Sequence, residues 1–507
     1  LSIDVGNRIG DDEARLRRDA DANLQAGRPG GRAPRTPLHW PLAFPEVLVD
    51  RPDPGFDAII GNPPFSGGQK ISGGAGSDYG AWLQRWDGGG TKGSADLAAR
   101  FVLRAQRLLN SRGQLGYIAT NTLLQGATLR VGLMQAVDRG FVLRGGRSSH
   151  RWPSSSANLE IVDVRASRAR LGAAAERWLD GEPVPSIGPD LEPVGRVAGR
   201  PRPLQENEDT AFQGSNVLGT GFTLTHEQAA ELIDRDPRNA EALQPYVIGK
   251  DLNQRPDCSA SRWIINFRNW PLDRAEKHPD LIDIVRRLVK PKRDDNKRVQ
   301  RRDRWWMYAE RAPELYAAIA ELAHVLALSR VSNAVLPVRV PTGPVFSEAS
   351  VVFALDGFAD LAVLSSSIHT CWVIRYTSTL ETRIRYAPSD VFRTLPRPVN
   401  TPALAELGQR LDTERRELML SRGWGLTTTY NHVHSPADRD PAVVNLREIH
   451  TAIDHAVLDA YGWPLDPEIG HHPTKIGTRW TVSPRARFEL LDLLLAENHR
   501  RHAQEQA

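Results

Sequence analysis

The sequence predicts an α/β fold that begins with a parallel sheet and continues into an α+β domain and a mainly helical C-terminal region. Short apolar runs at residues 56–60, 115–119 and 159–164 predict strands, and a helical pattern over residues 95–109 separates the first two. Strands that alternate with helices are typical of a parallel sheet. The C-terminal region has the pattern of helices, as in residues 403–420.

Composition divides the chain into five segments. Residues 181–209 are polar and rich in proline, and they predict a linker because they hold too few apolar residues to pack by themselves. Residues 1–37 mix charges with glycine and proline, which predicts a helix remnant and a linker. Residues 38–180 hold the predicted strands, residues 210–398 are rich in aromatic and basic residues, and residues 399–507 are the helical region.

Length and composition exclude several classes of protein. A chain of 507 residues is long enough for two or three domains, and 40% hydrophobic with 25% charged residues is ordinary for a globular protein. No apolar run is long enough for a membrane span, so we expect no membrane association. The chain begins with Leu1 and a polar segment that lacks the apolar core of a signal peptide, so we expect the true start to be missing.

The cysteines exclude two kinds of site. Cys258 and Cys371 are the only two, so the chain can build neither a disulfide framework nor a zinc site of four cysteines. This composition fits a protein of the reducing cytoplasm.

The residues with the clearest chemical meaning are Asn62, Pro63, Pro64 and Phe65, which follow the first predicted strand directly. In open α/β sheets, ligands bind outside the carboxyl ends of the strands, which is where this tetrapeptide is expected to lie. The alternative is a tight turn, for which Asn-Pro-Pro is a reasonable sequence.

This tetrapeptide suits methylation of the adenine amino group, which is a poor nucleophile because its lone pair is delocalised into the ring. The Asn62 amide oxygen and the Pro63 carbonyl can accept hydrogen bonds from that amino group and favour the pyramidal nitrogen that attacks a methyl group. Pro64 restricts the backbone, and Phe65 offers a face on which a flipped base stacks. The cysteines argue against C5-cytosine methylation, since it needs a nucleophilic cysteine, usually after a proline, and neither cysteine follows one.

Residues 55–65 resemble motif IV of the gamma-type N6-adenine DNA methyltransferases of fused type II G and type II L restriction-modification proteins. Similarity in the same order extends over roughly residues 38–502. The similar pieces include His39-Trp40, Ser94 to Leu97, Gly113 to Asn121, Arg151 to Pro153, Gly249 to Asn253, Lys290 to Arg293, Tyr386 and Leu446 to His450.

The resemblance implies a partial Rossmann-like methyltransferase sheet in residues 38–180 and a DNA target-recognition domain in residues 210–398. It implies S-adenosyl-L-methionine as methyl donor, duplex DNA as substrate, base flipping, and no metal. It also implies a place in a restriction-modification or phage-defence system, with a restriction subunit or the missing N-terminal half as partner. No convincing nuclease motif occurs in this chain.

The chain departs from the family where the donor should bind. A glycine-rich donor loop and an acidic ribose-binding residue should precede motif IV, and neither is found before Asn62. A permuted order would place the loop at residues 214–222, but no buried strand precedes that segment. An incomplete chain is the simpler explanation. The second hypothesis, beside the methyltransferase, is therefore a catalytically silent DNA-binding fragment.

Residues 286–304 are strongly basic, with ten lysines and arginines against three aspartates. Such a block is either a solvated face or a phosphate-binding surface. We assign DNA backbone contacts to six of these residues: Lys290, Lys292, Arg293, Arg298, Arg301 and Arg302. Residues 343–386 are then expected to read the base sequence.

Two further segments have alternative interpretations. The glycine-rich residues 66–76 either close over the catalytic site or are disordered. Trp305 and Trp306 are either a core pair or a platform for base stacking.

Overall fold

The computed structural model describes residues 11–506, apart from 29, 32, 66, 92, 153–159, 171, 173, 174, 196, 198, 297, 381, 382 and 475. The chain divides into two compact units, Leu1–Val194 and Gly195–Ala507. No helix within these described residues is long and apolar enough to cross a membrane.

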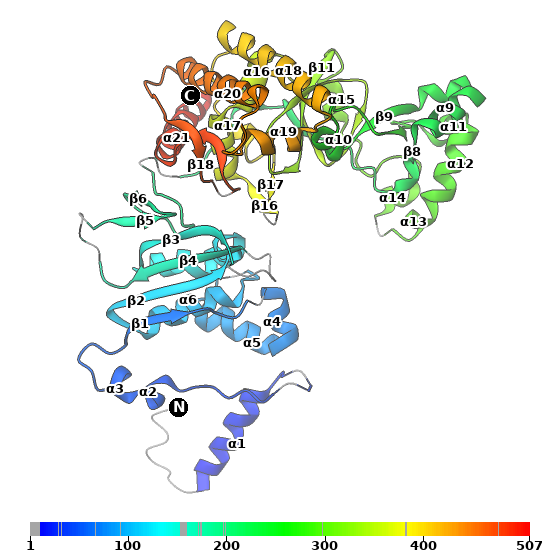
Figure 1. Ribbon diagram of the computed structural model, residues 1–507. Helices are drawn as coiled ribbons and strands as arrows, with labels where there is room; N and C mark the ends of the chain where they lie inside the picture. Colours follow the sequence, from blue (N-terminus) through cyan, green and yellow to red (C-terminus); the bar gives the residue numbers. More distant parts are fainter. Residues whose placement is uncertain are drawn as a thin grey trace. The chain divides into compact units, whose positions relative to one another are not determined.

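Unit 1 contains a six-stranded sheet in the order β1-β2-β4-β3-β5-β6 (Figure 1). Its strands are β1 (Phe56–Gly61), β2 (Leu109–Thr120), β3 (Val142–Arg151), β4 (Glu160–Ser167), β5 (Arg177–Leu179) and β6 (Glu182–Val184). Its helices are α1 (Asp11–Gln25), α2 (Trp40–Ala43), α3 (Pro45–Leu48), α4 (Gly68–Ala75), α5 (Ser77–Trp82), η1 (Leu83–Asp87), α6 (Leu97–Leu108), η2 (Asn121–Leu124), α7 (Gly126–Leu129), η3 (Arg130–Met134) and α8 (Gln135–Asp138).

The sheet is mixed, which corrects the prediction of a parallel one. β1 and β2 are parallel, but β4 runs antiparallel to both of its neighbours, β2 and β3. The predicted strand at residues 159–164 forms most of β4. Only residues 152–159 connect β3 to β4, which is too short for the crossover of a dozen or more residues that parallel strands need, so the two strands lie antiparallel. β3 therefore points the same way as β1 and β2, and the carboxyl ends of these three strands lie at one edge of the sheet.

One face of this sheet is covered by α6 and the helical segments that follow β2. α6 begins at its N-cap Asp96, whose side chain accepts a hydrogen bond from the Ala98 amide at 2.9 Å. Its apolar side packs on alternate residues of the strands, and the shared core includes Val102, Leu115 and Val162. A close approach of Gly132 to Ala99 lets η3 pack tightly against α6, since a Cβ atom at Gly132 would lie 2.9 Å from the Ala99 Cβ.

β1 is the edge strand of the sheet and is more exposed than the apolar sequence predicted. It pairs with β2 alone among the described strands. Ile59 packs against the core, but Ile60 projects from the other face and is 88% exposed. The apolar run correctly predicted a strand, but burial on both sides requires a second neighbour and a covered second face, and the described residues supply neither.

β5 and β6 form a hairpin whose second strand lies within the predicted linker, residues 181–209. Asp180 and Gly181 join the strands with φ angles of 54° and 90°. Two consecutive positive φ angles are typical of a type I′ turn, for which Asp-Gly is a preferred sequence. This dipeptide signal was missed because the flanking strands have three residues each. The two units divide after Val194, inside the same segment.

Unit 2 contains two main sheets, β14-β9-β10-β8 and β13-β11-β15-β7. Its strands are β7 (Ala211–Gln213), β8 (Thr223–Leu224), β9 (Leu243–Val247), β10 (Arg262–Ile265), β11 (His324–Ser329), β12 (Val331–Ser332), β13 (Val338–Pro341), β14 (Val345–Phe346), β15 (Ser350–Phe353), β16 (Ser378–Leu380), β17 (Arg383–Arg385), β18 (Ile469–His472) and β19 (Arg479–Val482).

Helices surround these sheets. They are η4 (Gln205–Asn207), η5 (Thr220–Phe222), α9 (His226–Arg235), η6 (Pro237–Glu241), α10 (Gly249–Gln254), α11 (Leu272–Ala275), α12 (Pro279–Leu288), α13 (Lys290–Asp294), α14 (Val299–Asp303), α15 (Pro313–Ala318), α16 (Phe358–Ser365), α17 (Ser367–Tyr376), η7 (Phe392–Thr394), α18 (Pro402–Arg422), α19 (Leu426–Val433), α20 (Pro441–Tyr461) and α21 (Pro484–Gln506).

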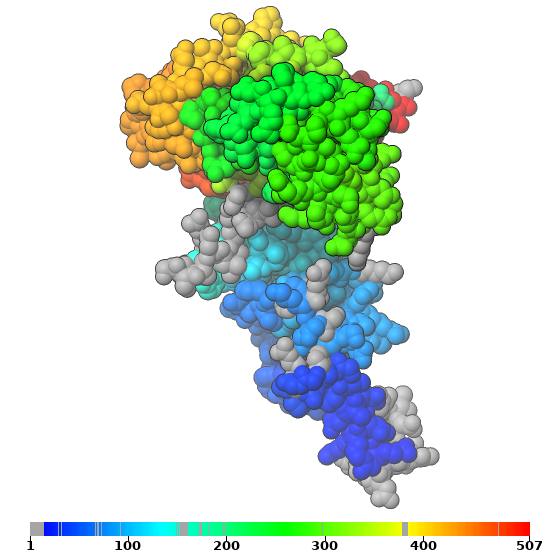
Figure 2. Space-filling model, turned by 90° about the vertical axis from the view of Figure 1, so that its right-hand side faces the viewer, coloured from blue at the N-terminus to red at the C-terminus, as the bar shows by residue number. Residues whose placement is uncertain are grey.

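Each main sheet of unit 2 has its own core. The sheet of β8 to β10 packs with α9, α12 and Trp306 in a lobe drawn in green (Figures 1 and 2). The sheet of β11, β13 and β15 shares one larger core with α16 to α21, reaching from Val247 to Leu495. The helices predicted after residue 399 therefore pack on the preceding sheet and complete its core.

Candidate functional site

The tetrapeptide Asn62 to Phe65 follows β1 without a break and is held by a rigid strand start. Gly55, before β1, has φ 134° and lies so close to β2 that a Cβ atom there would be 2.3 Å from the Asn110 amide nitrogen. Asp57 accepts hydrogen bonds from Asn110 at 2.7 Å and from Arg51 at 3.0 Å. The hydrogen bond from Arg51, followed by that from Asn110, lowers the pKa of Asp57, so this carboxylate stays ionised.

The four residues differ in exposure in a way that matters for binding a base. Pro63 is buried, whereas Asn62 and Pro64 are exposed and the Phe65 side chain is 42% exposed. The Asn62 side chain makes no hydrogen bond to another described residue. A buried proline anchors the loop while the amide and the aromatic ring remain accessible. These groups are able to accept hydrogen bonds from an amino group and to stack on a ring.

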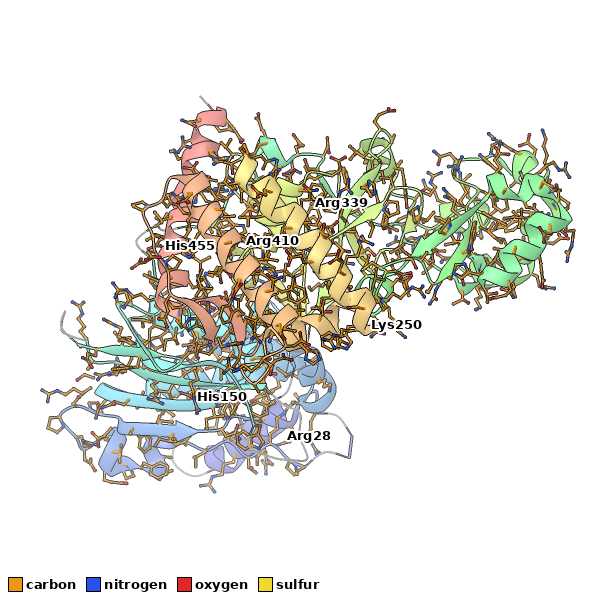
Figure 3. The ribbon with its side chains drawn as sticks, turned by 45° about the horizontal axis from the view of Figure 1, so that its top comes forward. Arg28, His150, Lys250, Arg339, Arg410 and His455 are labelled. Atoms are coloured by element: carbon orange, nitrogen blue, oxygen red, sulfur yellow. The ribbon has the colours of Figure 1, made fainter. Side chains whose placement is uncertain are left out.

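Two other strand ends lie at the same edge of the sheet. Thr120 ends β2 and lies next to β1, and its hydroxyl is 2.7 Å from that of Thr122. β3 ends near His150 and the half-buried Trp152, beyond β4. His150 is on the sheet of unit 1 (Figure 3). Burial is the main cause that lowers its pKa, and its Nδ1 atom has no partner among the described residues.

The glycine-rich stretch after Phe65 is helical. Residues 68–75 form α4, and α5 with η1 continues to Asp87; Ser66 lies outside the described residues. Tyr79 stacks on Trp82 with ring centroids 6.1 Å apart, and Trp82 and Trp86 are 50% and 61% exposed. The sequence analysis missed these aromatics, although their spacing of three and four residues is that of one helical face.

The permuted donor loop at residues 214–222 is not an open loop. Gly214 is packed against Phe346 and Ser347, since a Cβ atom there would lie 2.2 Å from the Ser347 carbonyl oxygen. The segment ends in η5, where Phe222 is fully buried. Before β1, the described residues form α1, α2 and α3 and no strand. No strand, glycine turn and helix in succession therefore precede Asn62 in the described part of the chain.

The structure divides the six basic residues assigned to DNA into three kinds. Arg293 is 2% exposed, and its guanidinium donates to the carbonyls of Val217 and Leu218 and of Trp305 and Met307. Its burial lowers the pKa to about 10. This guanidinium joins three chain segments, so its assignment to a DNA phosphate is corrected to a structural role.

Three other members are engaged in ion pairs on the surface of the lobe. Lys290 pairs with Asp294 at 3.0 Å, Arg301 with Glu310 at 3.1 Å and Arg302 with Asp303 at 3.1 Å. Exposed pairs of this kind are weak and can exchange for a phosphate. Their assignment to DNA stays a prediction.

Lys292 and Arg298 are exposed and form no ion pair within the described residues. Arg287 and Arg304, which the assignment omitted, have the same character. Lys297 lies outside the described residues. The basic residues that are exposed and unpaired, and therefore open to a phosphate, are not the same six that the density of basic residues in the sequence indicated.

The segment expected to read bases, residues 343–386, is mostly core. β14 and β15 are buried throughout, α16 is buried except at Phe358, and Ile368 and Trp372 of α17 are buried as well. Buried side chains cannot reach base edges, so within the described residues the prediction of base reading is restricted to exposed positions such as Glu348 and Arg385. Trp305 and Trp306 are 7% and 8% exposed, and the Trp306 indole donates to the Trp270 carbonyl at 2.9 Å, which makes them a core pair.

Comparison with known proteins identifies two regions. Residues 18–135 match the family model of the Eco57I restriction-modification methylase, and residues 194–399 match that of the MmeI target recognition domain. The first range contains the tetrapeptide after β1, and the second begins at the division between the two units. No curated protein matches the chain.

One solved structure has a similar fold over most of this chain. The Type IIL restriction-modification enzyme MmeI, solved in complex with DNA, is similar with a TM-score of 0.60 and 18% identity over 88% of this chain. The Type IIG restriction endonuclease BpuSI matches with a TM-score of only 0.30 and 12% identity, over 80% of this chain and 54% of that one. The chain spans 57% of the length of MmeI. The predicted fold class is confirmed: a methylase-like α/β region is followed by a region like a target recognition domain and by helices.

Proposed function

We propose that this chain is the catalytic and DNA-recognition part of a site-specific DNA methyltransferase that transfers a methyl group to adenine N6. The observation that carries the proposal is the exposed Asn62 amide and Phe65 ring at the carboxyl end of β1, within the methylase-like region. The likeness of residues 194–399 to a target recognition domain supports site-specific binding of duplex DNA.

On the acceptor side, Asn62 and Pro63 orient the adenine amino group. The amino group donates one hydrogen bond to the Asn62 amide oxygen and one to the Pro63 carbonyl, which draws the nitrogen lone pair out of conjugation with the ring. Phe65 stacks on the base after it has left the duplex. Buried Pro63 fixes the loop, so these acceptors need little reorganisation when the base arrives.

S-adenosyl-L-methionine is the proposed donor and supplies an electrophilic methyl group. The described residues do not by themselves fit this donor, because no glycine-rich loop between a strand and a helix precedes Asn62. The free edge of β1 and the exposed Ile60 mark where a further strand would pair. We propose that the donor site is completed by a polypeptide segment that pairs there, as part of a gamma-type arrangement in a fused restriction-modification system.

The decisive measurement is methyl transfer to duplex DNA by the protein with and without the Asn62→Ala substitution. The substitution should abolish methylation and leave DNA affinity nearly unchanged, because the amide contacts the flipped base and no phosphate. Asn23→Ala, at an exposed site on α1, is the matched control and should retain full activity. Equal activity of the Asn62 variant would refute the assignment.

The alternative is a DNA-binding module without catalysis. The absence of a donor loop from the described part of the chain favours it. Titration calorimetry with S-adenosylmethionine tests the enzyme: donor binding supports it and contradicts the module, whereas DNA binding without donor binding is the result for the module and for an enzyme whose donor site needs the further segment.

A further inference from the structure

Unit 2 encloses a cavity that lies between α17, α19, β19 and α21. All four elements contribute residues to the larger core, and α17 contacts α21 (Figure 1). The centre of a water-sized sphere can occupy ≈ 50 Å³ of the cavity. One water needs about 10–15 Å³ by the same measure, so the cavity has room for a group of several atoms.

Two hydrogen-bond donors in the cavity wall have no partner in the described part of the chain. Ser365 is 3% exposed, and its Oγ atom is buried without a hydrogen bond. Arg479 donates through Nη1 to the Thr478 carbonyl at 2.9 Å and through one proton of Nη2 to the Asn333 carbonyl at a long 3.5 Å, but its Nε atom is buried and unpaired. Buried donors are normally satisfied, because leaving one unpaired costs about 1–3 kcal/mol.

The wall of the cavity is positively charged. Arg479 and Arg487 line it, and its described lining residues include no Asp or Glu. Burial lowers the pKa of Arg479, and burial followed by the charge of Arg479 holds the pKa of His434 well below its usual range. A desolvated guanidinium without a carboxylate is costly, and a bound anion removes that cost.

Asp454, a buried carboxylate that contacts the lining residue Ser367, forms no ion pair with Arg479 within the described residues. Asp454 accepts a hydrogen bond from the Ser367 amide at the start of α17, at 2.7 Å. Burial raises the pKa of Asp454 to about 7. It is therefore partly protonated near neutral pH and is already used by the helix.

We propose that this cavity binds an oxyanion of the phosphate class, held by the Nε edge of Arg479 and by the Ser365 hydroxyl. Nε and Nη2 of a guanidinium present two parallel N–H groups that match two oxygens of a phosphate. Trp480 and Ile476 supply apolar walls for whatever carries the phosphate group. This site is separate from methyl transfer and would belong to unit 2 alone.

The test is calorimetric titration of the full chain with inorganic phosphate, at constant pH and ionic strength set with chloride. We expect saturable binding that weakens at least tenfold in Arg479→Gln. The matched control is Arg485→Gln on α21, whose side chain is 91% exposed, and it should bind phosphate as the unaltered chain does. No saturable binding, or equal loss in both variants, would overturn the proposal.

A second variant covers the case in which Arg479→Gln fails to fold. Ser365→Ala removes the unpaired hydroxyl without changing the charge, and it should weaken phosphate binding while leaving the melting temperature without phosphate unchanged or higher. Unchanged phosphate affinity in Ser365→Ala contradicts the proposed contact.

The source of the phosphate is identified by repeating the measurement with duplex DNA. If a DNA phosphate occupies the cavity, Arg479→Gln should reduce the slope of log affinity against log salt by about 0.9. If the ligand is a free phosphate compound, DNA binding should stay unchanged while phosphate binding is lost. Either result supports the oxyanion site, and neither depends on methyl transfer.

Discussion

β1 of unit 1 and β11 of unit 2 are apolar strands of six residues each, but their environments are opposite. β11 lies between β13 and β15, and five of its six residues are buried. β1 pairs on one side only, and its Ile60 is 88% exposed. Similar apolar runs therefore specify a strand in both units, whereas the neighbouring elements decide how much of the strand is buried.

The largest expected effect is a difference in the free energy of unfolding between substitutions in these two strands. Leu326→Ala in β11 removes a fully buried side chain and should cost about 2–5 kcal/mol of unfolding free energy. Ile60→Ala in β1 should change it by less than about 0.5 kcal/mol, because the side chain is already in water. Urea unfolding of the two variants measures both values. Equal losses would show that the second face of β1 is covered in solution.

The basic cluster offers the same comparison between a buried and an exposed residue. Arg293→Ala removes the donor from four carbonyls and should cost about 2–4 kcal/mol, as the melting temperature will report. Lys292→Ala, one residue away and exposed, should leave the melting temperature unchanged. A stable Arg293→Ala variant with weakened DNA binding would restore the original assignment of Arg293.

Buried titratable groups make the stability of unit 2 depend on pH. Burial lowers the pKa of His369 to about 4 and that of His450 to about 3, so the unfolded chain binds more protons between these values and about 6.5, the ordinary histidine pKa. These histidines therefore make stability rise with pH over that window and add nothing above it.

Asp454 opposes the histidines, because its raised folded pKa of about 7 means that the native state holds the extra proton between about 3.8 and 7. Its contribution is lost as pH rises through that range. Asp454→Asn should steepen the rise of stability with pH by about 1.4 kcal/mol per pH unit, measured by chemical unfolding at several pH values. An unchanged slope would mean that Asp454 is ionised in the folded protein.

The smallest expected effect is on DNA affinity, and it distinguishes the residues of the basic cluster that form ion pairs from those that do not. Replacing Lys292 and Arg298 together by Ala should reduce the slope of log DNA affinity against log salt by about 1.8, or about 0.9 for each phosphate contact. Arg286→Ala should change the slope less, since Arg286 is paired with Asp283 at 2.6 Å and with Glu276 at 3.0 Å. Fluorescence anisotropy over a salt series measures both slopes, and an unchanged slope in the double variant would indicate a solvated face.

Local features of the fold were predictable from the sequence. The strands at residues 56–60 and 115–119, the helix before the second of them and the long C-terminal helices all appear as β1, β2, α6, α18 and α21. The strands are short apolar runs and the helices have a repeating apolar period, and both signals lie within one segment of the sequence. The hairpin at Asp180-Gly181 carried an equally local signal, but its three-residue strands were too short to show a period.

The sequence by itself determined which hydrogen-bonding and aromatic groups the tetrapeptide offers and its place directly after a strand, because residue types and chain order specify both. Only the tertiary structure decided that Ile60 is exposed, that most of the described residues in 343–386 are buried, and that Arg293 is structural while Lys292 is exposed. The physical reason is that burial depends on which distant segments meet. Arg293, whose guanidinium donates to the carbonyls of Val217 and Met307, and Lys292, which faces water, carry the same charge in the sequence.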